Sequence, residues 1–440
     1  MLEQRHVPEQ PLRLRAGERG QGRSIEAAVR SAPGGPGHDR PGPPRARRAR
    51  VGVNAAFAAH AAISGCWGPR IPAVKEAAGL SDGELGVALT GFAAGLLIGT
   101  RLAGWPVERF GSRLVIRVGT PILAMALLRP ALARDLASLT VALVVFGVAA
   151  GMLDVAMNAQ AVAVERAHRR PLMSSIHATW SIGLLAGAGA GAGAASLGVP
   201  PVIHFALAAV VVAGASFVPL RGLLALHAPE FSQPHAVDVP VRLRRVSVAL
   251  PLALIGFASF FGEGAAADWS AVYLDGNLGT SEGVAALGFV AFSLGMAGAR
   301  LAGDRLVSRF GNTGVVRAGG LVGAAGLVLG LAVPASAVAV AGFALLGMGL
   351  APVVPLTFSV AGNTRYGRTG TALGWVVTVS YLGAILGPVI IGLTAERTSL
   401  RLALGIPAVL ALAIAAAARF VEPPDSPSSA GGSEGPTPYP

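Results

Sequence analysis

The sequence has few charged residues and almost no cysteine. Charged residues make up 13% of the 440 positions, whereas a typical soluble domain carries roughly 25%. Because 53% of the residues are hydrophobic, the chain cannot cover itself with a solvated surface. Cys66 is the single cysteine, which excludes an intramolecular disulfide and a cysteine metal cluster. No metal and no cofactor are expected.

Lysine is nearly absent as well. Lys75 is the only lysine, so arginine carries almost all of the basic charge behind the net charge of +12. This bias indicates a GC-rich coding sequence better than it indicates a nucleic-acid surface, and no nucleic-acid partner is expected.

What the sequence does contain is a series of long apolar blocks. Each block is about 20 residues long, enough to cross a hydrocarbon core of roughly 30 Å. The blocks predict an all-α polytopic membrane protein with twelve spans. The predicted spans cover residues 51–69, 84–103, 114–131, 138–164, 172–195, 201–219, 246–268, 283–303, 314–333, 338–361, 371–393 and 401–420.

Polar segments divide these spans into predicted domains. Residues 1–50 hold 11 Arg and 5 acids without apolar periodicity, which predicts a disordered tail. This tail lacks the apolar centre of a signal peptide, so we expect it to be kept unless the true start codon lies downstream. Two six-helix halves, 51–219 and 246–420, are expected on either side of a polar loop, 220–245. Residues 421–440 are expected to form a second disordered tail.

The arginines are distributed unevenly between the predicted loops. The inner loops carry 16 basic residues and the outer loops carry 6 when the tail is placed in the cytoplasm. By the positive-inside rule, both termini are predicted to be cytoplasmic. The expected location is the bacterial cytoplasmic membrane.

The two halves contain repeated motifs. RLAGWPVERFG (101–111) matches RLAGDRLVSRFG (300–311) at offsets of 199 and 200, and SIGLLAG (181–187) faces YLGAILG (381–387) at an offset of 200. A parallel duplication of this kind places a substrate between the halves near the bilayer midplane, with access alternating as the halves rock.

Together with the repeat, one loop motif resembles the signature of the major facilitator superfamily. GWPVERFGSR (104–113) has Glu108 where the signature has Asp, and Ser112 where it has a basic residue. The resemblance implies a transporter fold of twelve transmembrane helices in two pseudo-symmetric six-helix bundles. It also implies that Glu108, Arg109 and Arg113 form a cytoplasmic gate that latches the outward-facing state. The alternative is a set of solvated loop charges that obey the positive-inside rule.

A carboxylate interrupts the fourth predicted span. Counted from Glu165 at the inner edge, Asp154 lies roughly 16 Å deep, where an acid is costly unless it faces a wet cavity, finds a partner or is protonated. Gly147, Gly151, Asp154 and Asn158 share one helix face, which predicts close packing beside a cavity wall. Asp154 is expected to bind a polar substrate, a proton or both, and Asn158 to offer its amide; the alternative is a structural hydrogen bond.

The run DVAMN (154–158) resembles the acid-x-A-x-N motif of fucose-permease-like proton/sugar symporters, with Asp in place of their Glu. The segments SSIHATWS (174–181) and EGAAADWSAVYL (263–274) resemble a bacterial branch near those permeases. In the symporters the acid is linked to substrate and proton. The resemblance therefore implies a sugar-like solute and proton coupling.

Three other spans carry candidate binding residues. His177 and Ser181 share a face of the fifth span, with Trp180 one step round, and histidine can relay protons or bind a hydroxylated solute near neutral pH. Glu263 in the seventh span is expected to be a cavity carboxylate, and His60 in the first span is a further candidate. A satisfied structural histidine is the alternative for both His177 and His60.

Glycines near these residues predict helix contacts and bends. Gly262 and Gly264 flank Glu263 and are expected to let the seventh span bend or break. GAGAGAG (187–193) offers small residues four apart, which permits close helix contact.

The favoured function is secondary transport of a small polar solute, coupled to protons through Asp154 or Glu263. One alternative is proton-driven efflux of drug-like or waste compounds, but Leu143 stands where drug antiporters of the family carry an Arg four residues before Gly147. The other is a non-transporting receptor or scaffold. No arrangement of nucleophile, base and orienting residue indicates an enzyme. The expected partners are the bilayer, a small solute and protons, and the chain is expected to be monomeric.

Overall fold

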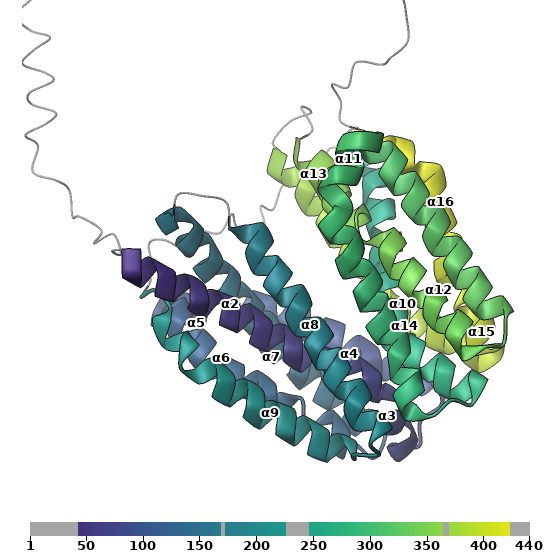
Figure 1. Ribbon diagram of the computed structural model, residues 1–440, viewed down its shortest axis with the longest axis horizontal. Helices are drawn as coiled ribbons and strands as arrows, with labels where there is room; N and C mark the ends of the chain where they lie inside the picture. Colours follow the sequence, from purple (N-terminus) through teal and green to yellow (C-terminus); the bar gives the residue numbers. More distant parts are fainter. Residues whose placement is uncertain (1–42, 169–171, 226–245, 364–368, 423–440) are drawn as a thin grey trace, which may run out of the picture. The chain divides into compact units, whose positions relative to one another are not determined.

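The computed structural model describes residues 43–168, 172–225, 246–363 and 369–422. Throughout these ranges the regular elements are helices (Figure 1), and ten helical segments are long and apolar enough to cross a membrane. The predicted all-α membrane class is therefore confirmed. Most of the first predicted tail, the central loop from 226 to 245, and residues 423–440 lie outside the described residues.

The elements of the first half are helices joined by short 3-10 segments. They are α2 (Pro43–Gly65), η1 (Gly68–Arg70), α3 (Ile71–Ala77), α4 (Asp82–Leu102), α5 (Gly104–Phe110), α6 (Ser112–Ala126), η2 (Pro130–Leu132), α7 (Leu136–His168), α8 (Met173–Ser196), α9 (Pro201–Phe217) and η3 (Pro219–Gly222).

The second half has the same character. Its elements are α10 (Val246–Leu278), α11 (Glu282–Ala332), α12 (Ser336–Leu350), α13 (Val353–Asn363), α14 (Thr369–Arg397), α15 (Leu400–Ala403), α16 (Gly405–Ala417) and η6 (Ala418–Val421).

The first helix begins earlier than the sequence predicted. Residues 43–50 were assigned to the disordered tail, but α2 starts at Pro43, and proline is well suited to the first helical turn. Ala46 and Ala49 are buried, and a side-chain carbon added at Gly222 would lie 2.4 Å from the Arg48 carbonyl oxygen. The early start follows from this packing of small residues against η3, which a composition argument does not detect.

Two of the twelve predicted spans, α2 and α8, are not among the ten described segments that meet the length and hydropathy requirement. Arginines lower the hydropathy of α2, while glycine, serine and histidine lower that of α8. The two helices pack closely, since carbons added at Gly183 and Gly187 would lie 2.6 and 2.1 Å from the carbonyl oxygens of Ala58 and Ala62. A helix sheltered by a partner helix needs less apolar surface than one that faces lipid.

Backbone geometry repeats between the halves at an offset of 200 residues. Gly111 has φ 79° and ψ 146°, and Gly311 has φ 69° and ψ 167°. The second of these interrupts α11, which therefore contains two predicted spans. Gly79 and Gly279 form a second pair, with φ 64° and 62°. These left-handed conformations favour glycine, so the same turns are specified in both halves.

Helix packing repeats at the same offset. A carbon added at Gly147 would lie 2.1 Å from the Phe92 carbonyl oxygen, and one added at Gly347 would lie 2.2 Å from that of Phe292. These contacts join α4 to α7 and α11 to α12, so the pseudo-symmetric halves share a close-packed backbone frame. In the GAGAGAG run, Gly187 and Gly191 make close contacts as predicted, but Gly189 and Gly193 have open space around them.

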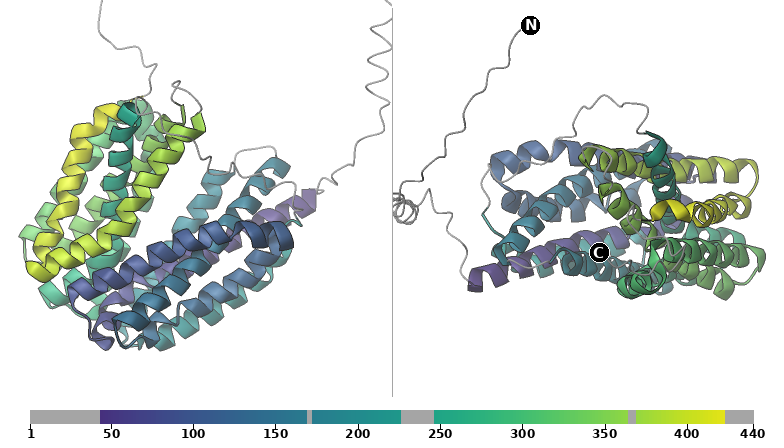
Figure 2. Two further views of the ribbon diagram at one scale, coloured as in Figure 1. Left: turned by 180° about the vertical axis from the view of Figure 1, so that it is seen from behind. Right: turned by 90° about the horizontal axis from the view of Figure 1, so that it is seen from above.

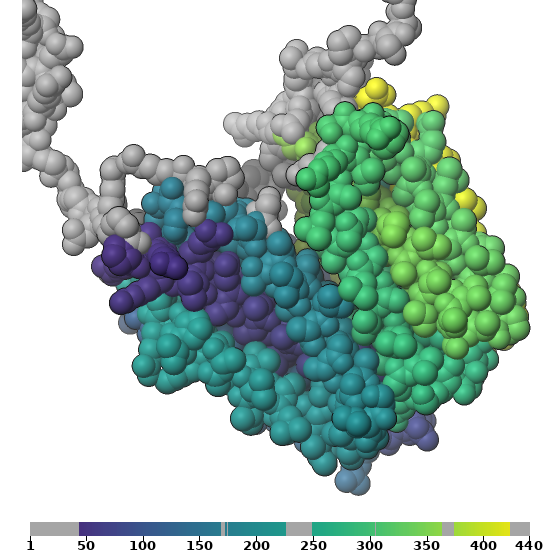
Figure 3. Space-filling view, viewed as in Figure 1, coloured from purple at the N-terminus to yellow at the C-terminus, as the bar shows by residue number. Residues whose placement is uncertain are grey.

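The halves meet through α4 with α14 and through α8 with α11. Among the described residues, the halves are joined at the end that carries α3 (Figure 1). At the opposite end, the space-filling surface has a notch between them (Figure 3). The further views show the same two groups of helices (Figure 2). By the arginine distribution, the joined end is the predicted outer end.

Candidate functional site

His60 and Trp180 are hydrogen-bonded to each other. The Trp180 indole N–H donates to His60 Nδ1 at 3.3 Å, and His60 Nε2 lies 3.3 Å from the Ala150 carbonyl oxygen. Because an indole nitrogen can only donate, Nδ1 is the acceptor and Nε2 carries the hydrogen. His60 is 7% exposed, so it orients the Trp180 ring, and both of its nitrogens are already engaged.

Asp154 and Asn158 lie together on α7. The Asn158 amide donates to the Asp154 backbone oxygen at 2.9 Å and to its carboxylate Oδ1 at 3.1 Å. Both side chains are half-buried. On the same helix, Gly147 and Gly151 pack against α4, as the glycine stripe predicted. Asn158 thus orients the carboxylate through Oδ1.

Glu263 lies on α10, in the other half. It accepts a hydrogen bond from Ser259 at 3.2 Å and is half-buried. Of the predicted bend or break beside it, the break is not found, because α10 continues as one helix from Val246 to Leu278. Gly262 instead makes room for Leu350, whose Cδ1 would lie 2.8 Å from an added carbon.

Tyr381 is acted on by the charges of both acids. This α14 residue lies within the electrostatic field of both Asp154 and Glu263. Its ring stacks on Phe260 at 5.1 Å between centroids, with 20° between the planes, and it is 38% exposed. Charges from both halves therefore act on one partly exposed aromatic pair.

Arg300 supplies a positive charge near this site. It acts electrostatically on both Glu263 and His177, and its own side chain is exposed. His177 is exposed too and meets Phe57 edge-on at 5.3 Å. Of the six predicted binding residues, the structure thus joins His60 to Trp180 and Asp154 to Asn158, and relates Glu263 and His177 through Arg300.

The predicted cytoplasmic gate has a different set of contacts. Glu108 and Arg109 are exposed on α5, and the ion pairs found within the described ranges both lie at the predicted outer end. Arg113 approaches the Arg221 carbonyl oxygen at 3.5 Å, and Arg117 donates to the same oxygen at 3.1 Å. These contacts stay within the first half.

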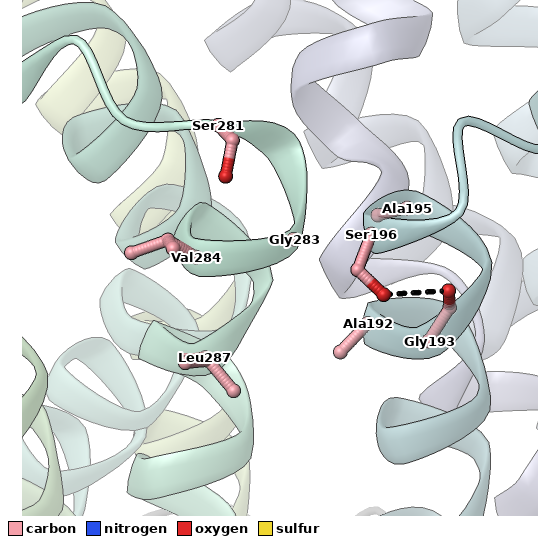
Figure 4. A pocket seen from close by; sticks show the side chains of 8 residues that line it. All are labelled: Ala192, Gly193, Ala195, Ser196, Ser281, Gly283, Val284 and Leu287. Carbon is pink, nitrogen blue, oxygen red and sulfur yellow. Dashed lines mark hydrogen bonds between the residues drawn. The ribbon is translucent and has the colours of Figure 1, made fainter.

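A separate hollow of about 400 Å³ lies between the end of α8 and the start of α11. Figure 4 shows Ala192 and Leu287 facing each other across it, and Ser196 bonded to the Gly193 carbonyl oxygen at 2.9 Å. Its lining carries hydroxyls but no charged group, so it lacks the chemistry of the central site.

Sequence reasoning missed Tyr381 and Arg300. The repeat offers a signal for both, because Tyr381 lies 200 positions after Ser181 and Arg300 opens the second copy of R-L-A-G. Gln160 was also missed. Its amide donates to Ser112 Oγ at 3.0 Å and to the Leu224 carbonyl oxygen at 2.7 Å, and so ties α7 to the start of α6 and to the segment after η3.

Comparison with known proteins identifies the family. The sequence profile of the Major Facilitator Superfamily matches residues 53–363 and 252–439. An uncharacterized MFS-type transporter of Yersinia pestis is 34% identical over 359 residues, which are 81% of this chain and 91% of the relative. The chain therefore belongs to the Major Facilitator Superfamily, a family of membrane transporters.

Solved structures agree with this fold. The nucleoside transporter NupG superimposes with a TM-score of 0.65 at 11% identity, covering 84% of this chain and 98% of that one. A D-xylose-proton symporter gives a TM-score of 0.65 at 17% identity, covering 86% and 96%. At these identities the likeness concerns the fold.

Proposed function

We propose that this transporter moves a small, polar, sugar-like solute across the cytoplasmic membrane and couples that movement to protons. The proposal includes two cytoplasmic termini and a monomeric transporter. Its first half ends at residue 219 and begins at Pro43 rather than at the predicted residue 51, and its second half covers residues 246–420. The fucose-permease-like motif around Asp154 supports the solute class and the coupling, and the likeness in fold to a D-xylose-proton symporter is compatible with both.

The observation that carries the proposal is that the charges of two acids, one from each half, act on Tyr381. Asp154 belongs to the first half and Glu263 to the second, and both act on the Tyr381 hydroxyl. A solute held there contacts both halves at once, as alternating access requires. Two membrane-embedded carboxylates also supply groups that can take up and release a proton.

The aromatic groups support a ring-shaped solute. Phe260 and Tyr381 of the second half form a stacked pair. In the first half, a hydrogen bond to His60 orients Trp180. Aromatic faces cover the apolar face of a sugar ring, while carboxylates and amides bind its hydroxyl edge. Asp154, Asn158 and Glu263 are assigned this second role, and His177 is assigned to the proton path.

Glu108, Arg109 and Arg113 are proposed to act at a different stage. We assign them to a cytoplasmic latch that forms when the inner ends of the halves close. Glu108 and Arg109 are exposed on α5, whereas Arg113 is half-buried and would have to leave the Arg221 carbonyl oxygen to join the latch. A carboxylate close to two guanidiniums can form charge-assisted pairs.

The test uses lightly buffered proteoliposomes and a pH electrode in the external solution. Sugars, polyols, organic acids and drug-like compounds are added singly to vesicles containing the wild-type protein, Asp154→Asn or the exposed control Glu422→Gln. External alkalinisation that depends on one solute class, is lost in Asp154→Asn and is kept in the control supports proton symport. Acidification on addition of drug-like compounds supports efflux instead.

Solute flux without a pH change, equal in the wild-type protein and Asp154→Asn, contradicts the proton role of Asp154. Binding without flux would support a receptor.

A further inference from the structure

The predicted outer end contains a buried arginine. Arg70 ends η1 and is surrounded by protein, with its side chain 2% exposed. Its Nη1 lies 3.3 Å from Glu282 Oε2 on α11, whereas the Glu282 side chain is 42% exposed. The two partners of this ion pair therefore have very different access to water.

The hydrogen bonds of Arg70 are incomplete. Nη2 donates to the Val199 carbonyl oxygen at 2.7 Å, while Nε and Nη1 are buried and donate no hydrogen bond to any described residue. A guanidinium has five N–H donors, so most of them lose water without gaining a well-formed hydrogen bond, and Nη1 keeps only its ion-pair contact with Glu282. Burial lowers the pKa of Arg70 and the charge of Glu282 raises it. Nearby His204, which is also buried, has no hydrogen-bond partner among the described residues.

This ion pair joins the two halves. Arg70 belongs to the first half and Glu282 to the second, and the neighbouring Gly68 lies against Phe289 of α11, 3.1 Å from an added carbon. The Gly83 N–H donates to Glu396 at 2.8 Å on another side of the same interface. The outer end is therefore closed by several contacts between the halves. Among the residues that make them, Arg70 is the one that carries a buried charge.

We propose that Arg70 and Glu282 form the outer gate of this transporter, and that the buried guanidinium limits the stability of the closed gate. Taking a charge out of water is costly, and an imperfectly bonded buried ion pair is often less stable than apolar residues of similar volume. When the gate opens, Arg70 regains water. Its charge therefore favours opening, while Glu282 offsets part of that tendency in the closed state.

Opposite effects are expected for the two partners. Arg70→Met keeps the length of the side chain and removes the charge, so it stabilises the closed gate. Glu282→Gln leaves Arg70 buried without its counter-charge, so it destabilises the closed gate. A gate held together mainly by the ion pair would open in both variants.

The reporter is a cysteine at a position that only an open outer gate exposes. Ala286 is 0% exposed. It lies four residues after Glu282 and three residues before Phe289, so the three residues share one helix face. Ala286→Cys is introduced with Cys66→Ala, and the purified protein in lipid nanodiscs reacts with a water-soluble maleimide. Gly276→Cys, at an exposed position, reports the intrinsic reaction rate.

We expect Glu282→Gln to raise the labelling rate at Ala286→Cys about tenfold and Arg70→Met to lower it several-fold. The double variant should label as slowly as Arg70→Met, because no buried charge is left without a partner. If Arg70→Met does not give monodisperse protein, Arg70→Leu takes its place, and it too should lower the labelling rate several-fold. The assay needs no solute, so it is independent of the proposed substrate.

Labelling of the Arg70 variants at or above the parent rate overturns the proposal. It is also overturned if Glu282→Gln does not label faster than the parent, or if the double variant labels as fast as Glu282→Gln.

Discussion

The two halves of the transporter share a backbone frame but differ in the chemistry of their centres. At one pair of repeat-related positions the first half has His60 and the second has Phe260; at another, Ser181 corresponds to Tyr381. The first half orients an indole through a hydrogen bond, whereas the second stacks two rings. The acids are not related by the repeat either, since Asp154 corresponds to Val354. The repeat specifies where helices touch, and each half was then free to acquire its own binding groups.

The largest expected effect breaks the shared frame. Gly147→Val and Gly347→Val place a branched side chain against carbonyl oxygens that already lie within 2.2 Å of an added carbon. Each should destabilise the fold by about 3 kcal/mol, to a similar degree in the two halves. Thermal unfolding in detergent measures this cost. Gly189→Val, in open space, is the control, and an equally large loss there would remove the packing explanation.

The next effect concerns the unequal acids. Asp154→Asn should lower proton-driven solute accumulation about a hundredfold, the scale expected for losing a proton-transfer group. Adding Val354→Asp, which places an acid at the corresponding position of the second half, should not restore accumulation. Radiolabelled uptake into proteoliposomes measures both variants. Recovery in the double variant would mean that the halves are interchangeable at this position.

A smaller effect is expected when the first half is made to resemble the second. His60→Phe removes the acceptor for Trp180, and Trp180→Phe removes the donor. Each should weaken solute binding about tenfold, because a buried hydrogen bond contributes about 1 kcal/mol and also orients the ring. The double variant should be little worse than either single variant. Additive losses in equilibrium binding would show that the two side chains act separately.

The smallest effect belongs to the hydroxyl of Tyr381. Tyr381→Phe keeps the stack on Phe260 and removes the hydroxyl on which both acids act, so KM should rise about threefold. Tyr381→Ala removes the stack as well and should raise KM further. If both variants had the wild-type KM in initial-rate uptake, the aromatic pair would have no part in binding.

Much of the fold could be predicted because its signals are local. Apolar blocks indicated the spans, and the recurrence of R-F-G indicated two related halves; in both copies the structure gives the glycine of this motif, Gly111 and Gly311, a positive φ. The start of α2 could not be predicted in this way. Its arginines resemble a disordered tail, and the buried face of Ala46 and Ala49 depends on packing against other helices.

The candidate site was predictable only where a residue is costly in a membrane. Asp154 and Glu263 stand out because an acid inside an apolar span is costly in free energy and is usually kept for a function. Tyr381 and Phe260 are ordinary in such spans, and their relation to the acids arises from helices that are far apart in the sequence. The His60–Trp180 bond likewise joins residues 120 positions apart.

The central claim, that acids from both halves couple a solute to protons at one site, is tested most directly by comparing exchange with accumulation. Solute-loaded proteoliposomes containing the wild-type protein, Asp154→Asn or Glu263→Gln are assayed for counterflow without a pH gradient and for net uptake with one. At least one variant is predicted to keep exchange while losing gradient-driven accumulation, because a proton carrier is needed only for the net cycle. If both variants accumulate solute as the wild-type protein does, the claim is contradicted.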